Sequence, residues 1–150
     1  MKYTEANLSR VFILRLYQNE TIHEVIEKFA AMKHIKNAIC FFLGGAEDKS
    51  KLVVGPKDGT VMSQQIMLTL LKGVHEGLGV GTIFTGETGN PKLHMHGSFG
   101  RNDATANAVT GCIRLGVQVW QIGEVIIFEL SGGNAIRKKD MNTGFEMLEC

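Results

Sequence analysis

The sequence predicts an α+β fold in which a mostly antiparallel β-sheet is flanked by helices on one side. Three observations lead to this prediction. Short apolar runs follow one another with turn-length connections, only one stretch has clear helical spacing, and the 18 glycines suit many tight turns. With 150 residues and an ordinary composition, 44% hydrophobic and 21% charged, the chain predicts a single domain over residues 1–150.

The first half of the chain predicts a strand, one helix and three further strands. The first strand is expected over Val11–Tyr17, and Thr21 with Glu24 has the spacing of a capping box at the start of the helix. Apolar residues then recur at helical spacing, at Ile22, Val25, Ile26, Phe29 and Met32. The three strands are expected over Asn37–Leu43, Lys51–Val54 and Ile66–Leu71. The last is a short apolar run that periodicity alone does not assign, and we interpret it as a strand.

The second half of the chain predicts further strands that are separated by glycines. They are expected over Val80–Thr85, Lys92–Phe99, Val117–Ile122, Val125–Leu130 and Phe145–Leu148. The glycine-rich stretch Gly77–Gly81 precedes a strand instead of joining a strand to a helix, which excludes a Rossmann-type nucleotide site. The basic run Arg137–Lys139 is interpreted as a solvated turn.

Charge and cysteine content narrow the class of protein. The net charge of +1 provides no global field that would draw the chain onto nucleic acid. No apolar stretch is long enough to predict a membrane span, so no membrane partner is expected. Three cysteines without close spacing argue against a disulfide framework and predict a reducing, cytoplasmic location.

Two histidines stand two residues apart in the expected strand Lys92–Phe99. Because side chains alternate along a strand, His94 and His96 project from the same face, which is a chelating arrangement for a transition metal. Taken alone the motif is weak. A pair of strand histidines that are hydrogen-bonded on a partly exposed face fits it equally well.

Cys112 offers a third ligand. It lies sixteen residues after His96, beyond the polar segment 102–110, which we expect to leave the sheet and return. A thiolate there completes a set of two histidines and one cysteine and leaves the fourth tetrahedral position open for water or substrate. The alternative is a small buried residue with no ligand role.

Charged residues in apolar or glycine-rich surroundings are candidates for chemistry in the same pocket. Arg101 could clamp a carboxylate or phosphate, and Glu124 could move a proton. A structural Arg–Glu pair at the sheet edge fits equally well. The sequence assigns no role to His75, Glu76 and Arg114.

These residues resemble the PPC domain, the plants and prokaryotes conserved domain, in its stand-alone prokaryotic form. The resemblance spans nearly the whole chain and is most specific in the second half. It is carried by Gly89-Asn90-Pro91-Lys92-Leu93-His94-Met95-His96-Gly97-Ser98-Phe99-Gly100-Arg101, Thr110-Gly111-Cys112-Ile113, Ile122-Gly123-Glu124-Val125-Ile126 and the closing Thr143-Gly144-Phe145-Glu146-Met147-Leu148.

The resemblance implies an α+β fold on an antiparallel sheet, assembled as a homotrimer. Metal-binding members use an H-x-H strand and a later histidine in a Gly-Gly-His-Leu stretch. His94 and His96 match the first two ligands, and Cys112 stands where the third histidine usually stands, an exchange that zinc accepts. The fold is also similar to that of α-acetolactate decarboxylase, a metal enzyme with histidine ligands. That likeness is an analogy of fold only.

Two functions follow as hypotheses. The first is a zinc-binding PPC-type domain with a DNA-binding or regulatory role, because prokaryotic members are usually labelled "putative DNA-binding" proteins. The Arg-Gly-Arg-Pro hook of plant members does not occur in this sequence. The second is a small metal-dependent lyase or hydrolase acting on a small anionic substrate, with Arg101 holding the anion and Glu124 as acid or base. A third option is a scaffold with a vestigial pocket at a trimer interface.

Overall fold

The protein is described by a computed structural model that covers residues 1–61, 65–101 and 107–150. One helix, α1 (Ile22–Met32), accompanies ten strands in this part of the chain. The strands are β1 (Asn7–Tyr17), β2 (Asn37–Ala46), β3 (Lys51–Pro56), β4 (Ile66–Leu70), β5 (His75–Thr85), β6 (Pro91–Gly100), β7 (Ala108–Cys112), β8 (Val119–Ser131), β9 (Ile136–Lys139) and β10 (Glu146–Glu149).

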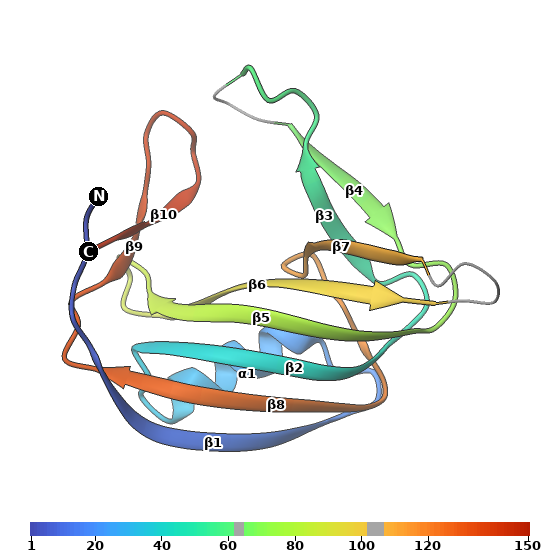
Figure 1. Ribbon diagram of the computed structural model, residues 1–150, viewed down its shortest axis with the longest axis horizontal. Coiled ribbons are helices and arrows are strands. Elements are labelled where there is room, and N and C mark those ends of the chain that lie inside the picture. Colours follow the sequence, from blue (N-terminus) through green and yellow to red (C-terminus); the bar gives the residue numbers. More distant parts are fainter. Residues whose placement is uncertain (62–64, 102–106) are drawn as a thin grey trace.

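Eight strands form one antiparallel sheet in the order β1-β8-β2-β5-β6-β7-β3-β4, and β9 pairs with β10 in a separate ribbon. α1 lies against one face of the large sheet (Figure 1). The predicted α+β class with a mostly antiparallel sheet is therefore confirmed. More than one flanking helix is expected from the sequence, but the described residues contain one helix, α1. None of the helical residues described here forms a segment long and apolar enough to cross a bilayer.

The core lies between α1 and the sheet. Ile22, Ile26 and Ala30 are fully buried on one side of the helix, as its apolar spacing predicts. Alternate residues of the strands face them, including Leu16, Phe42, Ile83, Met95, Phe99, Val125 and Ile127. No helix of the described residues covers the other face of the sheet, which we call the outer face.

The capping box expected at the start of α1 is not formed. Among the described residues no side-chain capping hydrogen bond involves Thr21. Thr21 instead has an extended backbone and bridges to Gln118, while the Ile22 N–H donates to the Val117 carbonyl at 3.0 Å. The free Ile22 N–H at the start of the helix is thus satisfied by the neighbouring backbone and not by the Thr21 hydroxyl.

Several strand boundaries differ from the expectations. Ile66–Leu70 is a strand, as interpreted, but Val117–Ile122 and Val125–Leu130 merge into β8. Gly123 does not end the strand because it packs closely against β2: a Cβ added at Gly44 would lie 2.9 Å from the Gly123 Cα. Residues 108–110, the end of the segment 102–110 that is expected to leave the sheet, belong instead to β7 (Ala108–Cys112). Residues 102–106 of that segment lie outside the described residues.

The glycine-rich stretch Gly77–Gly81 lies inside β5, not before a strand as expected. Its alternate glycines face the core, where a Cβ on Gly81 would lie 2.7 Å from the Met95 Cβ and one on Gly77 would collide with the Phe99 ring. The glycines therefore make room for two buried side chains of β6. They serve packing, and the exclusion of a nucleotide fingerprint stands.

Candidate metal centre

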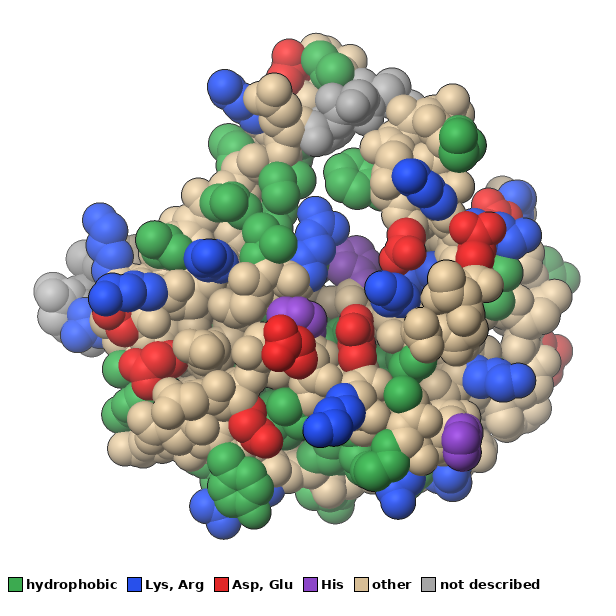
Figure 2. Space-filling model, turned by 180° about the vertical axis from the view of Figure 1, so that it is seen from behind, with side chains coloured by type: hydrophobic (Ala, Val, Ile, Leu, Met, Phe, Trp, Pro, Cys, Tyr) green, Lys and Arg blue, Asp and Glu red, His purple; other side chains and the backbone are tan. Residues whose placement is uncertain are grey.

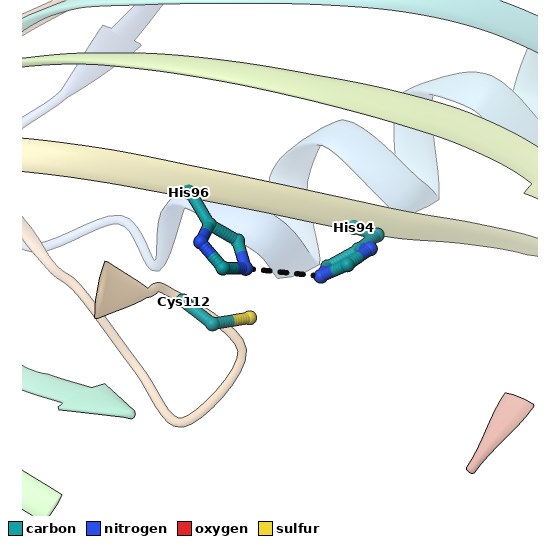
Figure 3. A group of neighbouring side chains, drawn as sticks. All are labelled: His94, His96 and Cys112. Carbon is teal, nitrogen blue, oxygen red and sulfur yellow. Dashed lines mark hydrogen bonds between the residues drawn. The ribbon is translucent and has the colours of Figure 1, made fainter. Parts of the chain in front are cut away.

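The two histidines and the cysteine predicted as metal ligands lie together on the outer face. His94 and His96 stand two apart on β6, so their side chains leave the strand on the same side. Cys112 is the last residue of β7 and pairs directly with His96. All three side chains point toward one another (Figure 3).

The separations of the donor atoms fit one metal ion. The Nε2 atoms of His94 and His96 are 3.1 Å apart, and the ligand atoms of all three residues lie within 4.8 Å of one another. Two imidazole nitrogens on a tetrahedral zinc, with bonds of about 2.0–2.1 Å, are separated by roughly 3.3 Å. In the described residues this is the only group of three or more His, Cys, Asp or Glu side chains close enough to hold a metal.

The surroundings of the donors favour ligation. Partial burial, assisted by the positive charges of Arg137 and Arg114, lowers the pKa of His94 and keeps its imidazole neutral, the form that binds metal. Cys112 is buried beside exposed histidines. Cys40 lies in the core away from this group, and burial raises the pKa of its thiol to about 12 and leaves it unreactive.

The three residues line an open cavity of about 670 Å³, a volume typical of small-molecule sites. The cavity wraps around the edge of β6 and is also lined by α1, β3 and the segment that leads into β10. Its charged side chains are the cations Lys92, Arg114 and Arg137 and the carboxylates Glu27 and Glu146. Figure 2 shows a hollow in one face of the molecule with histidine, lysine and arginine side chains beside it.

Arg137 is the main residue that the sequence interpretation missed. The run Arg137–Lys139, expected as a solvated turn, forms β9, and Arg137 is only 7% exposed. Its Nη2 donates to the Thr82 hydroxyl at 3.0 Å, and its guanidinium lies 5.7 Å from the centre of the Phe84 ring. The alternation along a strand, with Lys138 pointing outward, is the signal that could have found it.

Arg101 and Glu124 are not among the residues that line the cavity. Arg101 lies beyond the far end of β6, where its Nη1 donates to the Lys72 carbonyl at 3.5 Å. Glu124 is on β8, opposite Leu43, with two strands between it and β6. The structure does not bring them to the histidines, and their catalytic roles stay predictions.

The structure also distinguishes the three residues to which the sequence assigns no role. Arg114 lines the cavity, with its guanidinium 5.8 Å from the centre of the Phe145 ring. His75 is buried at the start of β5, and its Nδ1 is 2.9 Å from the Gly73 carbonyl oxygen, so it belongs to a local turn. Glu76 lies beside it and is exposed. Only Arg114 therefore joins the site.

Fold and site together define a small α+β protein whose antiparallel sheet presents a His–His–Cys group inside a cavity. The family model of the Plants and Prokaryotes Conserved (PCC) domain matches residues 3–131. The chain belongs to this family, which is the PPC domain that the sequence resembles. None of the curated proteins matches the chain.

Solved structures share the fold along nearly the whole chain. A plant- and prokaryote-conserved protein from Pyrococcus horikoshii has a TM-score of 0.83 at 22% identity, covering 99% of this chain and 97% of its own. A metal-containing protein from Archaeoglobus fulgidus has the same score and identity, with 98% of each chain covered. A protein from Ralstonia eutropha described as a "putative DNA-binding protein" has a TM-score of 0.71 at 22% identity, covering 92% and 90%.

Proposed function

We propose that this PPC-family protein binds a divalent transition metal, with zinc as the first candidate, through the Nε2 atoms of His94 and His96 and the sulfur of Cys112. The observation that carries the proposal is the convergence of these donors within 4.8 Å on the wall of a cavity. Imidazole and thiolate together suit zinc, and the description of the Archaeoglobus relative as metal-containing supports the same reading.

His94, His96 and Cys112 would hold the ion with three protein ligands and would leave a fourth position of a tetrahedral zinc for water or substrate. A bound zinc ion supplies Lewis-acid chemistry, either polarising a carbonyl or lowering the pKa of a bound water. The chain holds the histidines on a rigid strand, and the buried Cys112 fixes the third ligand. Lys92 and Arg114 line the approach and draw anions toward it.

Metal analysis of the purified protein tests the proposal. We expect about one zinc per chain after incubation with zinc and removal of excess, as a four-coordinate site predicts. His94→Ala and Cys112→Ser should each lose most of this metal, whereas His34→Ala, a change outside the cavity, should keep it. Equal zinc content in His94→Ala and the unaltered protein would exclude the site.

The cavity favours a second candidate, a metal-dependent lyase or hydrolase acting on a small anionic substrate. Such an enzyme needs an open metal position and cationic groups beside it. The three proposed ligands would leave such a position, and Lys92, Arg114 and Arg137 line the same cavity. Activity against a panel of small carboxylate and phosphate esters should disappear on chelation and in His94→Ala. Glu124→Gln and Arg101→Gln test whether these residues take part. Activity that survives chelation would reject this candidate.

DNA binding is a separate proposal, supported by the names of two similar structures, from Ralstonia eutropha and Bacteroides thetaiotaomicron. The net charge of +1 predicts weak, strongly salt-dependent binding at most. A gel-shift titration with duplex DNA at low salt measures it. Absence of any retained complex at low salt would end the proposal. A DNA-linked role and the free thiols Cys40, Cys112 and Cys150 fit a cytoplasmic location.

We also propose that the protein is a homotrimer joined through the outer face. Rows of apolar side chains cross this face in register, one of them through Ile13, Ile126, Phe41 and Val80 up to His96. These apolar residues are exposed, Ile13 to 83%, and such a patch marks an interface between chains. Light scattering should give a mass of three chains per particle for the unaltered protein. The double variant Ile13→Lys/Phe41→Glu should have the mass of a single chain. Met32→Lys, at an exposed position of α1, is the control.

A further inference from the structure

A buried arginine without a carboxylate partner lies in the wall of the candidate metal cavity. Arg137 is 7% exposed, and its Nε is completely buried with no hydrogen-bond partner in the described residues. In the part of the chain that the structure describes, its one hydrogen bond with another side chain joins Nη2 to the neutral hydroxyl of Thr82. The two salt bridges of the described chain join Lys2 to Glu149 and Arg10 to Glu129, so neither involves Arg137.

An unpaired charge in such a position is costly unless something compensates it. Removing a guanidinium from water carries a large free-energy penalty, and for this reason buried arginines are normally paired. The negative charges that act on Arg137 are those of Glu146 and of an ionised Cys112, but among the described residues neither forms an ion pair with it. The neutral contacts with Thr82 and Phe84 do not cancel the charge. The protein thus holds a partly desolvated cation ready for an anion.

The position of Arg137 relative to the metal ligands indicates where that anion would lie. Arg137 lines the same cavity as His94, His96 and Cys112, and its charge reaches His94. Lys92 and Arg114 add positive charge to the wall, and a divalent ion on two neutral imidazoles and one thiolate would leave a further net positive charge. Glu27, one of the two carboxylates there, is already engaged by the Leu93 N–H.

We infer that the cavity binds a small oxyanion, a carboxylate or a phosphate, whose charged group is held by Arg137 while a second polar group reaches the open metal position. The planar guanidinium matches the two oxygens of either group. The cavity volume of about 670 Å³ accommodates a small molecule. A DNA backbone does not fit this role, because a side chain only 7% exposed is out of reach of phosphates on a rigid duplex.

This inference rests on the proposed metal site and names its ligand class. Calorimetric titration of the zinc-loaded protein with sodium malonate and with inorganic phosphate tests it, and the stronger binder identifies the preferred oxyanion. Arg137→Gln should weaken binding of that probe at least about tenfold, because a charge-assisted hydrogen bond is lost. The anion affinity of Arg137→Lys should lie between that of the unaltered protein and that of Arg137→Gln. Lys138→Gln, on the exposed side of the same strand, should change affinity less than twofold.

Stability distinguishes anion binding from a structural role. Because Arg137 is a buried charge that forms no ion pair among the described residues, Arg137→Gln should leave the melting temperature of the free protein unchanged or raise it, while zinc content stays the same. No binding of either probe to the unaltered protein, or equal binding by Arg137→Gln, would overturn the inference. So would a fall of several degrees in melting temperature with unchanged anion affinity.

Failure of the metal proposal would look different. In that case the unaltered protein would hold no zinc. The titration is therefore repeated on metal-free protein, where we expect weaker binding that still depends on Arg137. If the unaltered protein takes up no zinc but still binds the anion in an Arg137-dependent way, the anion site stands and the metal site is removed. Zinc uptake without anion binding would do the reverse.

Discussion

His96 and Cys112 are direct cross-strand partners in the antiparallel register between β6 and β7. Residues paired in this way project from the same face, so the sulfur lies beside the imidazole without any loop having to position it. His94 joins them because it is two residues away on β6. The candidate metal site is therefore a consequence of strand register, and changes in register or ligand type should alter it in defined ways.

The exchange of the third ligand is the first testable consequence. The resemblance described above implies a histidine ligand at the position of Cys112, so Cys112→His should still bind about one zinc per chain. Cys112→Ser should bind zinc at least about tenfold more weakly, because a strong donor is removed. Competition with a coloured chelator measures both affinities.

Cobalt substitution provides the check on ligand identity. With Cys112 as a ligand, the cobalt-loaded protein should show the near-ultraviolet charge-transfer absorption of a thiolate, which Cys112→His should lack. Identical spectra for the two proteins would show that the sulfur does not coordinate, and the three-ligand site would then be wrong.

Gly111 should be required for the position of Cys112. A Cβ at Gly111 would lie 2.6 Å from the carbonyl oxygen of Val53 on β3, and backbone atoms of a paired strand cannot move aside easily. Gly111→Ala should therefore push β7 away from β3, lower stability by about 1–3 kcal/mol and weaken zinc binding. Gly100→Ala, where the nearest contact is an ordinary 3.8 Å, is the matched control. Equal denaturation midpoints for the two variants would contradict this account.

Local pattern was enough to predict the antiparallel sheet, the helix and the H-x-H pair. Each depends on the spacing of side chains within one segment, which the sequence contains directly. Period-two alternation places His94 and His96 on one face, and apolar recurrence at helical spacing places Ile22 and Ile26 in the core. The interpretation of Ile66–Leu71 as a strand, which periodicity alone does not decide, is confirmed by β4 (Ile66–Leu70).

Local pattern did not predict which charged side chains line the cavity, because that depends on contacts between residues distant in the chain. Arg137 is buried because β9 pairs with β10 and bridges to Gly86, and a run of three basic residues contains no sign of these contacts. Arg101 adjoins the histidine strand in sequence, but it lies beyond the end of β6, five residues from His96. Glu124 does lie on the outer face, but two strands separate it from β6. Proximity in sequence was a poor guide to the membership of the cavity.

Stability should depend on pH through Glu129. Hydrogen bonds from Arg10, at 2.6 Å and 2.7 Å to the two carboxylate oxygens, lower the pKa of Glu129 in the folded protein. A carboxylate with a lowered folded pKa stabilises the protein above the pKa of its unfolded state, and this contribution is lost as the pH falls through the folded value. Glu129→Gln should therefore melt a few degrees lower at pH 7.

The difference in melting temperature between Glu129→Gln and the unaltered protein should shrink below pH 4.5, the ordinary value for a glutamate, and vanish in stronger acid. Glu5→Gln, an exposed change near the N-terminus, should show no such dependence. A difference that stays constant from pH 7 into strong acid would mean that the ionised Arg10 pair contributes nothing to stability.

Glu27 should act as a positioning residue for His94. Its Oε1 accepts a hydrogen bond of 2.9 Å from the Leu93 N–H, and Leu93 lies where β6 has lost its β7 neighbour, because that pairing ends at His96. Glu27→Ala leaves the N–H without this acceptor and frees the strand that carries His94, so zinc affinity should fall several-fold. Glu27→Gln keeps an amide oxygen in place and should recover most of it. Hydrogen exchange at the Leu93 amide should quicken in Glu27→Ala alone. Equal exchange in both variants would show that the helix does not steady the metal-binding strand.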